Sequence, residues 1–127
     1  MRKLMVLIIS VVMLISCSKD DVHNPSGLKI RLSNVSPYNY QNIVVNTSTG
    51  NVNFENLESG QKTDYKVFEK AYRYSFVELQ IADKTYTIQP IDYVGETPLE
   101  TGNYTYQIKA NDSEDRYTRL SLTLIEE

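Results

Sequence analysis

The sequence predicts an all-β domain of the two-sheet sandwich class. Over residues 28–127, apolar and polar residues alternate in short runs, which is the period-two pattern of half-buried strands. Gly, Pro, Asn and Asp separate these runs, and no segment there shows the 3.6-residue period of a helix. Because 100 residues suit one core, seven to eight short strands indicate a single Greek-key β-sandwich.

Three runs in the first half of this domain have the strand pattern. "LKIRLSN" (28–34) alternates strictly, with its leucines and isoleucine on one face. Residues 40–47 form the second predicted strand, and the turn sequence "STGN" leads from it to a short third piece at 52–54.

The middle of the domain contributes two further strands. Residues 55–62 are predicted to form a loop, in which Leu57 fills one edge of the core. "TDYKVFEK" (63–70) has aromatic residues on both faces, which suits an edge strand. "YSFVELQI" (74–81) is a strand with one apolar face. The residues of that face are Val77, Leu79 and Ile81.

The last third begins with a turn at "ADK" and a strand at 85–92. Pro90 cannot donate a ladder hydrogen bond, so this strand lies at an edge or ends there. Residues 93–102 form the longest connection, and 103–110 pairs with 116–125 in a hairpin. Three residues of the first hairpin strand should face three of the second: Tyr104, Tyr106 and Ile108 opposite Leu120, Leu122 and Leu124.

Residues 1–16 have the pattern of a cleaved secretory signal peptide. Arg2 and Lys3 precede an apolar run from 4 to 15. That run is shorter than the about twenty apolar residues that a spanning helix needs. A charged start, a short apolar core and a small residue at Ser16 are typical of a signal peptide.

Cys17 is the one cysteine of the chain, so it has no disulfide partner. No cluster of ligands surrounds it for a metal, and no fixed histidine activates it, because His23 lies in the same polar stretch. Leu14-Ile15-Ser16-Cys17 resembles the lipobox of bacterial lipoproteins. The resemblance implies diacylglycerol on the Cys17 thiol, cleavage before Cys17 and acylation of its new amino group. The alternative is an ordinary secretory signal with an incidental cysteine.

Residues 17–27 are expected to form a lipidated flexible tether, because they are too polar to offset their ordering cost. Ser18 replaces the aspartate that often retains lipoproteins in the inner membrane, so the resemblance implies the outer membrane. The residues Ser18, Lys19, Asp20 and Asp21 are similar to the export signal of surface lipoproteins of Bacteroidetes. The alternative is a solvated linker, in which any polar residues would serve.

Two details refine the predicted sandwich. The spacing Leu99-x-x-Gly102-x-Tyr104 resembles the tyrosine corner of Greek-key sandwiches, in which a tyrosine hydroxyl bonds to backbone just upstream. The alternative is a core tyrosine without that bond. The pattern of 28–127 as a whole is similar to small immunoglobulin-like or prealbumin-like modules of bacterial lipoproteins, and this resemblance implies no functional residues.

Composition excludes several functions. Removal of residues 1–16 leaves 11 basic and 16 acidic side chains, a net charge of −5, which argues against a nucleic-acid partner. No histidine or cysteine lies in 28–127, so a triad-type enzyme and a His/Cys metal site are not expected. "NDSED" (111–115) gathers oxygen ligands, but it lacks the spacing of a calcium loop and suits a solvated hairpin tip. We expect no enzyme activity, no cofactor and no metal.

The remaining feature is tyrosine, of which the chain has ten. Tyrosine suits binding surfaces because it is large, stiff and amphipathic. The candidate binding face consists of Tyr38, Tyr40, Tyr72 and Tyr93. The alternative is that these tyrosines pack strands and cover edges. The sequence therefore favours a surface-exposed, lipid-anchored, non-enzymatic module that binds a glycan or an envelope protein, attached to the membrane through its lipid. The alternative function is a periplasm-facing structural or assembly subunit without its own ligand.

Overall fold

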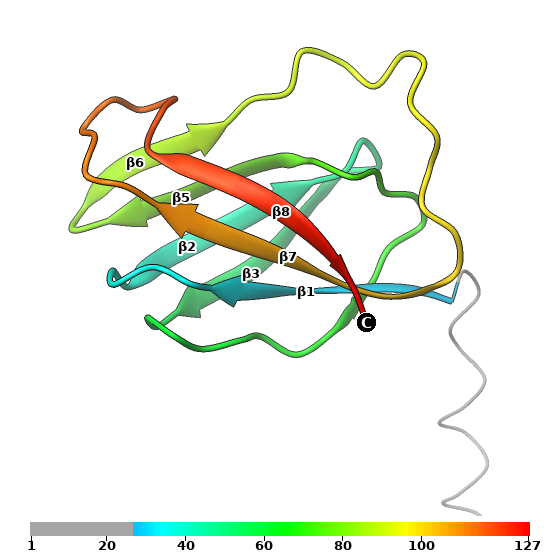
Figure 1. Ribbon diagram of the computed structural model, residues 1–127, viewed down its shortest axis with the longest axis horizontal. Helices are drawn as coiled ribbons and strands as arrows, with labels where there is room; N and C mark the ends of the chain where they lie inside the picture. The colour runs from blue at the N-terminus through cyan, green and yellow to red at the C-terminus, as the bar shows by residue number, and fades with distance from the viewer. Residues whose placement is uncertain (1–26) are drawn as a thin grey trace, which may run out of the picture.

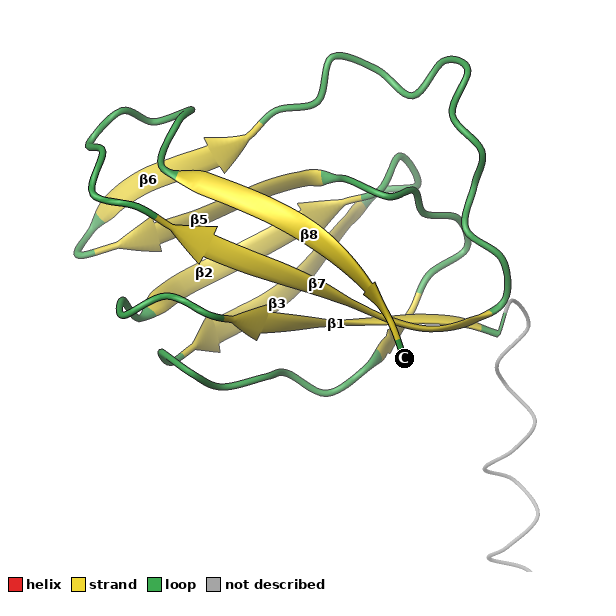
Figure 2. Cartoon of the chain, in the orientation of Figure 1, coloured by secondary structure: helices red, strands yellow, loops and turns green. Residues whose placement is uncertain are grey.

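The computed structural model describes residues 27–127 as two packed four-stranded sheets (Figure 1). These residues form strands and loops only (Figure 2), so no helix among them could cross a membrane. The eight strands are β1 (Leu28–Asn34), β2 (Tyr40–Asn46), β3 (Asn51–Leu57), β4 (Lys66–Val67), β5 (Phe76–Ile81), β6 (Lys84–Ile88), β7 (Gly102–Ala110) and β8 (Leu120–Glu126). The predicted β-sandwich is therefore confirmed.

The strand order defines how the chain is divided between the two sheets. Sheet A has the order β4-β1-β7-β8, with β1 and β7 parallel, and sheet B has the order β3-β2-β5-β6. In immunoglobulin constant domains the first two strands share a sheet. Here β1 and β2 lie in different sheets, so the strand order differs from that of a constant domain.

The core lies between the sheets and follows the alternation of the sequence. Leu28, Ile30 and Leu32 of β1 belong to one buried core cluster with the inward residues of β5, which are the predicted Val77, Leu79 and Ile81. The hairpin strands β7 and β8 also share a face as predicted, since Tyr106 pairs with Leu124 and Ile108 with Leu122. Large buried side chains complete the core: Tyr40, Ile43, Val45, Phe54, Leu57, Phe68, Tyr86 and Tyr104.

Three predicted boundaries differ from the structure. The strand expected at 63–70 is reduced to Lys66–Val67, because Phe68 turns into the core as its N–H bonds to the Leu28 carbonyl at 2.9 Å. The third strand is longer than predicted and includes Leu57, which is buried as expected. The last strand begins at Leu120, because the Asp115 carboxylate accepts the Tyr117 N–H at 3.0 Å and holds a turn.

The predicted tyrosine corner is confirmed. The Tyr104 hydroxyl donates to the Glu100 carbonyl at 2.8 Å, four residues upstream. The Tyr104 ring is buried, and its edge passes Gly102 at 3.8 Å from where a Cβ would stand. This bond fixes the entry of the longest loop, 89–101, into β7.

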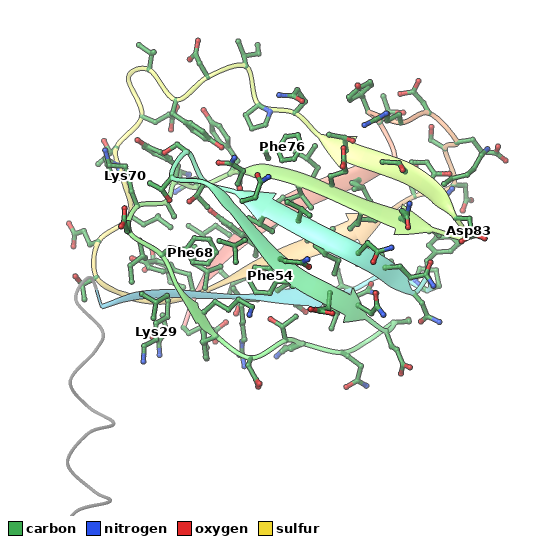
Figure 3. The ribbon with its side chains drawn as sticks, turned by 180° about the vertical axis from the view of Figure 1, so that it is seen from behind. Lys29, Phe54, Phe68, Lys70, Phe76 and Asp83 are labelled. Carbon is green, nitrogen blue, oxygen red and sulfur yellow. The ribbon has the colours of Figure 1, made fainter. Side chains whose placement is uncertain are left out.

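The sandwich has two distinct ends (Figure 3). The proximal end is where the chain enters β1, and it also carries loop 89–101, since the Gly102 N–H bonds to the Gly27 carbonyl at 3.0 Å. Figure 3 shows Lys29 and Lys70 at this end and Asp83 at the opposite, distal end. The distal end carries the 82–83 turn and loop 111–119. The predicted signal peptide, the lipobox and residues 17–26 of the tether lie outside the described residues.

Candidate functional site

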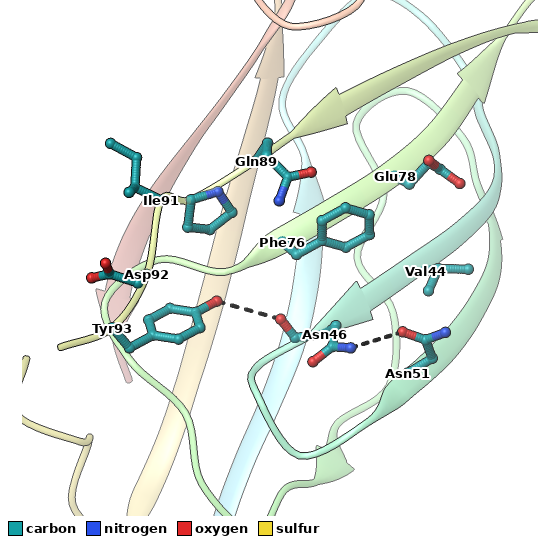
Figure 4. Close-up of a pocket in the computed structure, with 10 residues that line it drawn as sticks. Val44, Asn46, Asn51, Phe76, Glu78, Gln89, Ile91, Asp92 and Tyr93 are labelled. Atoms are coloured by element: carbon teal, nitrogen blue, oxygen red, sulfur yellow. Dashed lines mark hydrogen bonds between the residues drawn. The ribbon is translucent and has the colours of Figure 1, made fainter.

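An open pocket lies at the proximal end, between the outer face of sheet B and the start of loop 89–101 (Figure 4). Alternation in β2 and β5 buries one set of side chains and points the other set outward. The outward residues of these two strands that form the pocket floor are Val44, Asn46, Phe76 and Glu78. Asn51 of β3 and residues 89–93 complete the pocket, which has a volume of about 430 Å³.

Stacked tyrosines hold the loop wall of this pocket in place. The Tyr93 ring stacks on Tyr72, with centroids 4.4 Å apart and planes at 10°. The Tyr74 ring also stacks on Tyr93, with the two centroids 5.6 Å apart. The Tyr93 hydroxyl also makes a long bond of 3.4 Å to the Asn46 carbonyl (Figure 4). Burial raises the pKa of the Tyr93 hydroxyl above its ordinary value.

Further contacts tie the same loop to the domain. The Leu99 N–H donates to the Ala71 carbonyl at 2.8 Å. The Asp92 carboxylate accepts the Val94 N–H at 3.1 Å, which closes a tight turn. Ile91 nevertheless remains 98% exposed at the pocket rim. The wall is therefore preformed, while its apolar edge faces solvent.

The amide side chains of the pocket are only partly used by the fold. Asn46 donates from Nδ2 to Asn51 Oδ1 at 3.0 Å (Figure 4) and accepts the Ser48 N–H at 2.8 Å. This leaves the Asn51 Nδ2 group available as a donor. Gln89 is exposed and makes no hydrogen bond with the described residues. The pocket therefore offers free amide donors and acceptors beside an apolar floor.

The pocket is weakly acidic. Glu78 and Asp92 are its charged residues, and no lysine or arginine lines it. Arg116 reaches Glu78 from loop 111–119, with Nη2 at 2.9 Å from Oε2. This ion pair offsets the charge of Glu78, so Asp92 alone contributes an unpaired negative charge to the pocket.

The four tyrosines predicted as a binding face do not form one, so that prediction is wrong. Tyr38 and Tyr40 lie at the distal end, whereas Tyr72 and Tyr93 lie at the proximal end, one strand length away. Tyr40 is fully buried and Tyr72 is 8% exposed. Tyr40 belongs to the core cluster, and Tyr72 is stacked against the Tyr93 ring of loop 89–101. Only Tyr93 of the four lines the pocket.

The predicted hairpin tip "NDSED" uses its oxygens within the fold. The Asn111 amide oxygen accepts the Ser113 N–H at 2.8 Å. Tyr38 donates to Asp112 at 2.8 Å, and Lys84 pairs with Glu114 at 3.0 Å. Residues 27–127 hold no group of three or more potential metal-binding His, Cys, Asp or Glu side chains.

Sequence reasoning missed Phe76 as a site residue, although a signal was present. The alternation that places Val77 inward places Phe76 and Glu78 outward on the same strand. A single outward aromatic residue is common on protein surfaces, so this signal marks Phe76 as a candidate only together with the apolar residues that the fold brings beside it. Asn51 and Gln89 had no comparable signal, because only the fold brings them beside Phe76.

Comparison with known proteins gives information on the fold and none on the function. No family model and no curated protein matches the chain. Among solved structures, the chain is similar to the NMR structure of a protein from Eubacterium rectale, with a TM-score of 0.51 and 16% identity. The match covers 78% of this chain and 86% of that chain. At this identity the likeness shows a shared fold.

Proposed function

We propose that the chain is a lipid-anchored, non-enzymatic binding module of the outer membrane that faces the cell surface. The observation that carries the binding role is the preformed pocket beside loop 89–101. Its floor contains a partly exposed aromatic ring, Phe76, and its rim contains amide groups that the fold leaves free. A concave site with an apolar floor and a few polar groups is the usual form of a small-ligand site.

The anchor is supported by the residues before and after Cys17. The lipobox-like Leu14-Ile15-Ser16-Cys17 supplies a site for lipid attachment, and residues 18–21 resemble an export signal. One acyl chain binds a membrane reversibly, at about 0.8 kcal/mol for each buried methylene, whereas two or three chains hold a domain firmly. The binding domain would thus be held at the membrane without a spanning segment.

The anchor is tested by Cys17→Ser in the full-length chain, expressed in its own host with labelled palmitate. We expect the variant to lose the label and to leave the membrane fraction, because no thiol remains to be alkylated. Ser18→Ala is the matched control and should keep both. A Cys17→Ser protein that still carries label would refute the anchor.

The orientation is tested by adding protease to intact cells that carry the wild-type chain. Digestion before lysis is expected for a surface protein. Protection until the cells are lysed would instead support the periplasm-facing subunit. A periplasmic marker protein, which must stay intact before lysis, controls for leakage.

The binding role is tested with residues 28–127, which contain all eight strands and the whole described core. The labelled domain should show saturable binding to intact cells or to the polymers that the cells release, and Phe76→Ala should abolish that binding. Tyr117→Ala is the matched control, because Tyr117 is an exposed aromatic residue in the distal loop 111–119. Equal behaviour of the two variants would remove the pocket from the binding role.

A further inference from the structure

We infer that the pocket binds a neutral saccharide, with one sugar ring packed against Phe76. This inference names the ligand class of the proposed binding module and rests on that function. It follows from four properties of the pocket: its apolar floor, its free polar groups, its charge and its size.

The floor suits the apolar face of a sugar ring. Phe76 is partly exposed and lies in the middle of the pocket, between Val44 and the loop (Figure 4). The face of an aromatic ring carries the negative part of its quadrupole, so it attracts the polarised C–H groups of a pyranose. Pro90 and Ile91 extend this apolar surface on the loop side.

The rim suits the hydroxyl groups around such a ring. A sugar hydroxyl both donates and accepts a hydrogen bond, so it needs partners of both kinds. Gln89 offers a donor and an acceptor, and Asn51 offers the Nδ2 donor that its bond to Asn46 leaves free. The carboxylates of Glu78 and Asp92 are acceptors for further hydroxyls. The pocket thus combines an apolar floor with a polar rim, as a sugar ring combines an apolar face with polar hydroxyls around its edge.

The charge of the pocket disfavours an anionic ligand and offers little to a cationic one. No cation lines the pocket, so a phosphate or an acidic sugar would meet Asp92 without any compensating partner. A cationic peptide would find only the Asp92 carboxylate unpaired, because Arg116 already pairs with Glu78 at 2.9 Å. A neutral ligand avoids the repulsion by Asp92 and does not depend on its single charge.

The size of the pocket suits one sugar ring of a longer saccharide. The volume of about 430 Å³ lies in the lower part of the range, about 300–1,000 Å³, found for small-ligand sites. The pocket opens toward solvent along exposed residues such as Asn51 and Ile91. A saccharide can therefore leave one ring over Phe76 and continue along the flank of sheet B.

The test is an NMR titration of isotope-labelled residues 28–127 with defined probes. The neutral probes are glucose, xylose and mannose oligosaccharides with α and β linkages. An oligogalacturonide is the anionic probe, and an oligolysine peptide is the cationic one. At least one neutral probe should shift the side-chain amide signals of Asn51 and Gln89 and the ring signals of Phe76, while the anionic probe should shift none of these.

Variants then assign the contact. Phe76→Ala should weaken binding of that neutral probe by about tenfold or more, since an aromatic anchor commonly carries this much of the affinity. Asn51→Asp removes a donor at constant size and should also weaken binding. Tyr117→Ala should bind like the wild type.

Each contrary outcome overturns the saccharide inference. If the oligolysine peptide shifts the pocket signals and no neutral saccharide does, the ligand is a cationic segment and the proposed binding function stands. If no probe shifts them while the labelled domain still binds cells through Phe76, the ligand is of another class. If the cell-binding assay also fails, the binding function itself falls.

Discussion

Two fully buried tyrosines provide a sharp test of how this core is stabilised. Tyr106 and Tyr40 are both 0% exposed, and each donates its hydroxyl to a backbone carbonyl. Tyr106 donates to the Tyr72 carbonyl at 2.7 Å, and no other described group donates to that oxygen. Tyr40 donates to the Ile108 carbonyl at 2.9 Å, which also accepts the Val35 N–H at 3.2 Å. Substitution by phenylalanine therefore leaves the acceptor carbonyl without a donor in one case and with a remaining donor in the other.

The expected free-energy changes follow from this difference. Tyr40→Phe removes one hydrogen bond from a carbonyl that keeps a second donor, so it should cost about 0.5–1.5 kcal/mol of unfolding free energy. Tyr106→Phe leaves a buried carbonyl unpaired and should cost more, about 1–3 kcal/mol. For a domain of this size, a loss of about 2 kcal/mol lowers the Tm by roughly 10 °C.

The assay is urea unfolding of residues 28–127, followed by circular dichroism, with thermal unfolding as a second measurement. Tyr117→Phe is the control, because its exposed hydroxyl makes no hydrogen bond with the described residues and its loss should change stability by less than about 0.5 kcal/mol. The reasoning is refuted if Tyr106→Phe matches this control, or if Tyr40→Phe is the more costly of the two.

Alkaline pH and a buried arginine give two further predictions. Burial raises the pKa of Tyr40 and Tyr106 above the ordinary 10.0, so their contribution to stability is complete below pH 10.0 and is lost as the pH rises toward the folded-state values. The tyrosinate absorbance of Tyr40 and Tyr106 should therefore appear only as the circular dichroism signal of the β-sheets is lost. Ionisation of all tyrosines near pH 10.0 in a domain that keeps this signal would contradict the prediction. Arg119 donates from Nη1 to the Tyr86 hydroxyl at 3.1 Å and to the Ser113 carbonyl at 3.2 Å. Arg119→Lys should lower the unfolding free energy by about 1–3 kcal/mol. Arg73→Lys changes an exposed side chain and should leave the unfolding free energy unchanged. Equal urea midpoints for these two variants would show that the Arg119 guanidinium does not stabilise the fold.

Local rules predicted most of the strands because alternation is a property of neighbouring residues. The inward sets of β1 and β5 follow directly from period two, and Pro90 correctly indicated that β6 ends early at an edge of sheet B. The tyrosine corner also has a local signature, since Gly102 and Tyr104 lie within four residues of the carbonyl that accepts the bond.

The same rules failed where a residue's role depends on distant chain. Residues 63–70 alternate well enough for a strand, yet Phe68 is drawn inward by β1, and only two residues pair. Tyr40 and Tyr72 look available in sequence, but segments far along the chain bury them. A tyrosine that packs in the core and a tyrosine that is exposed on a binding surface can have the same neighbours in the sequence.

The sequence by itself therefore determined the class of fold, which residues of most strands face the core and, through the residues around Cys17, the expectation of a lipid anchor. Only the tertiary structure decided which strands share a sheet, including the parallel pairing of β1 with β7 across more than seventy residues. It also decided where a ligand could bind, because the pocket combines side chains from β2, β3, β5 and loop 89–101. The physical reason is that periodicity fixes which face of a strand is apolar, whereas pairing and concavity arise when the whole chain buries those faces together.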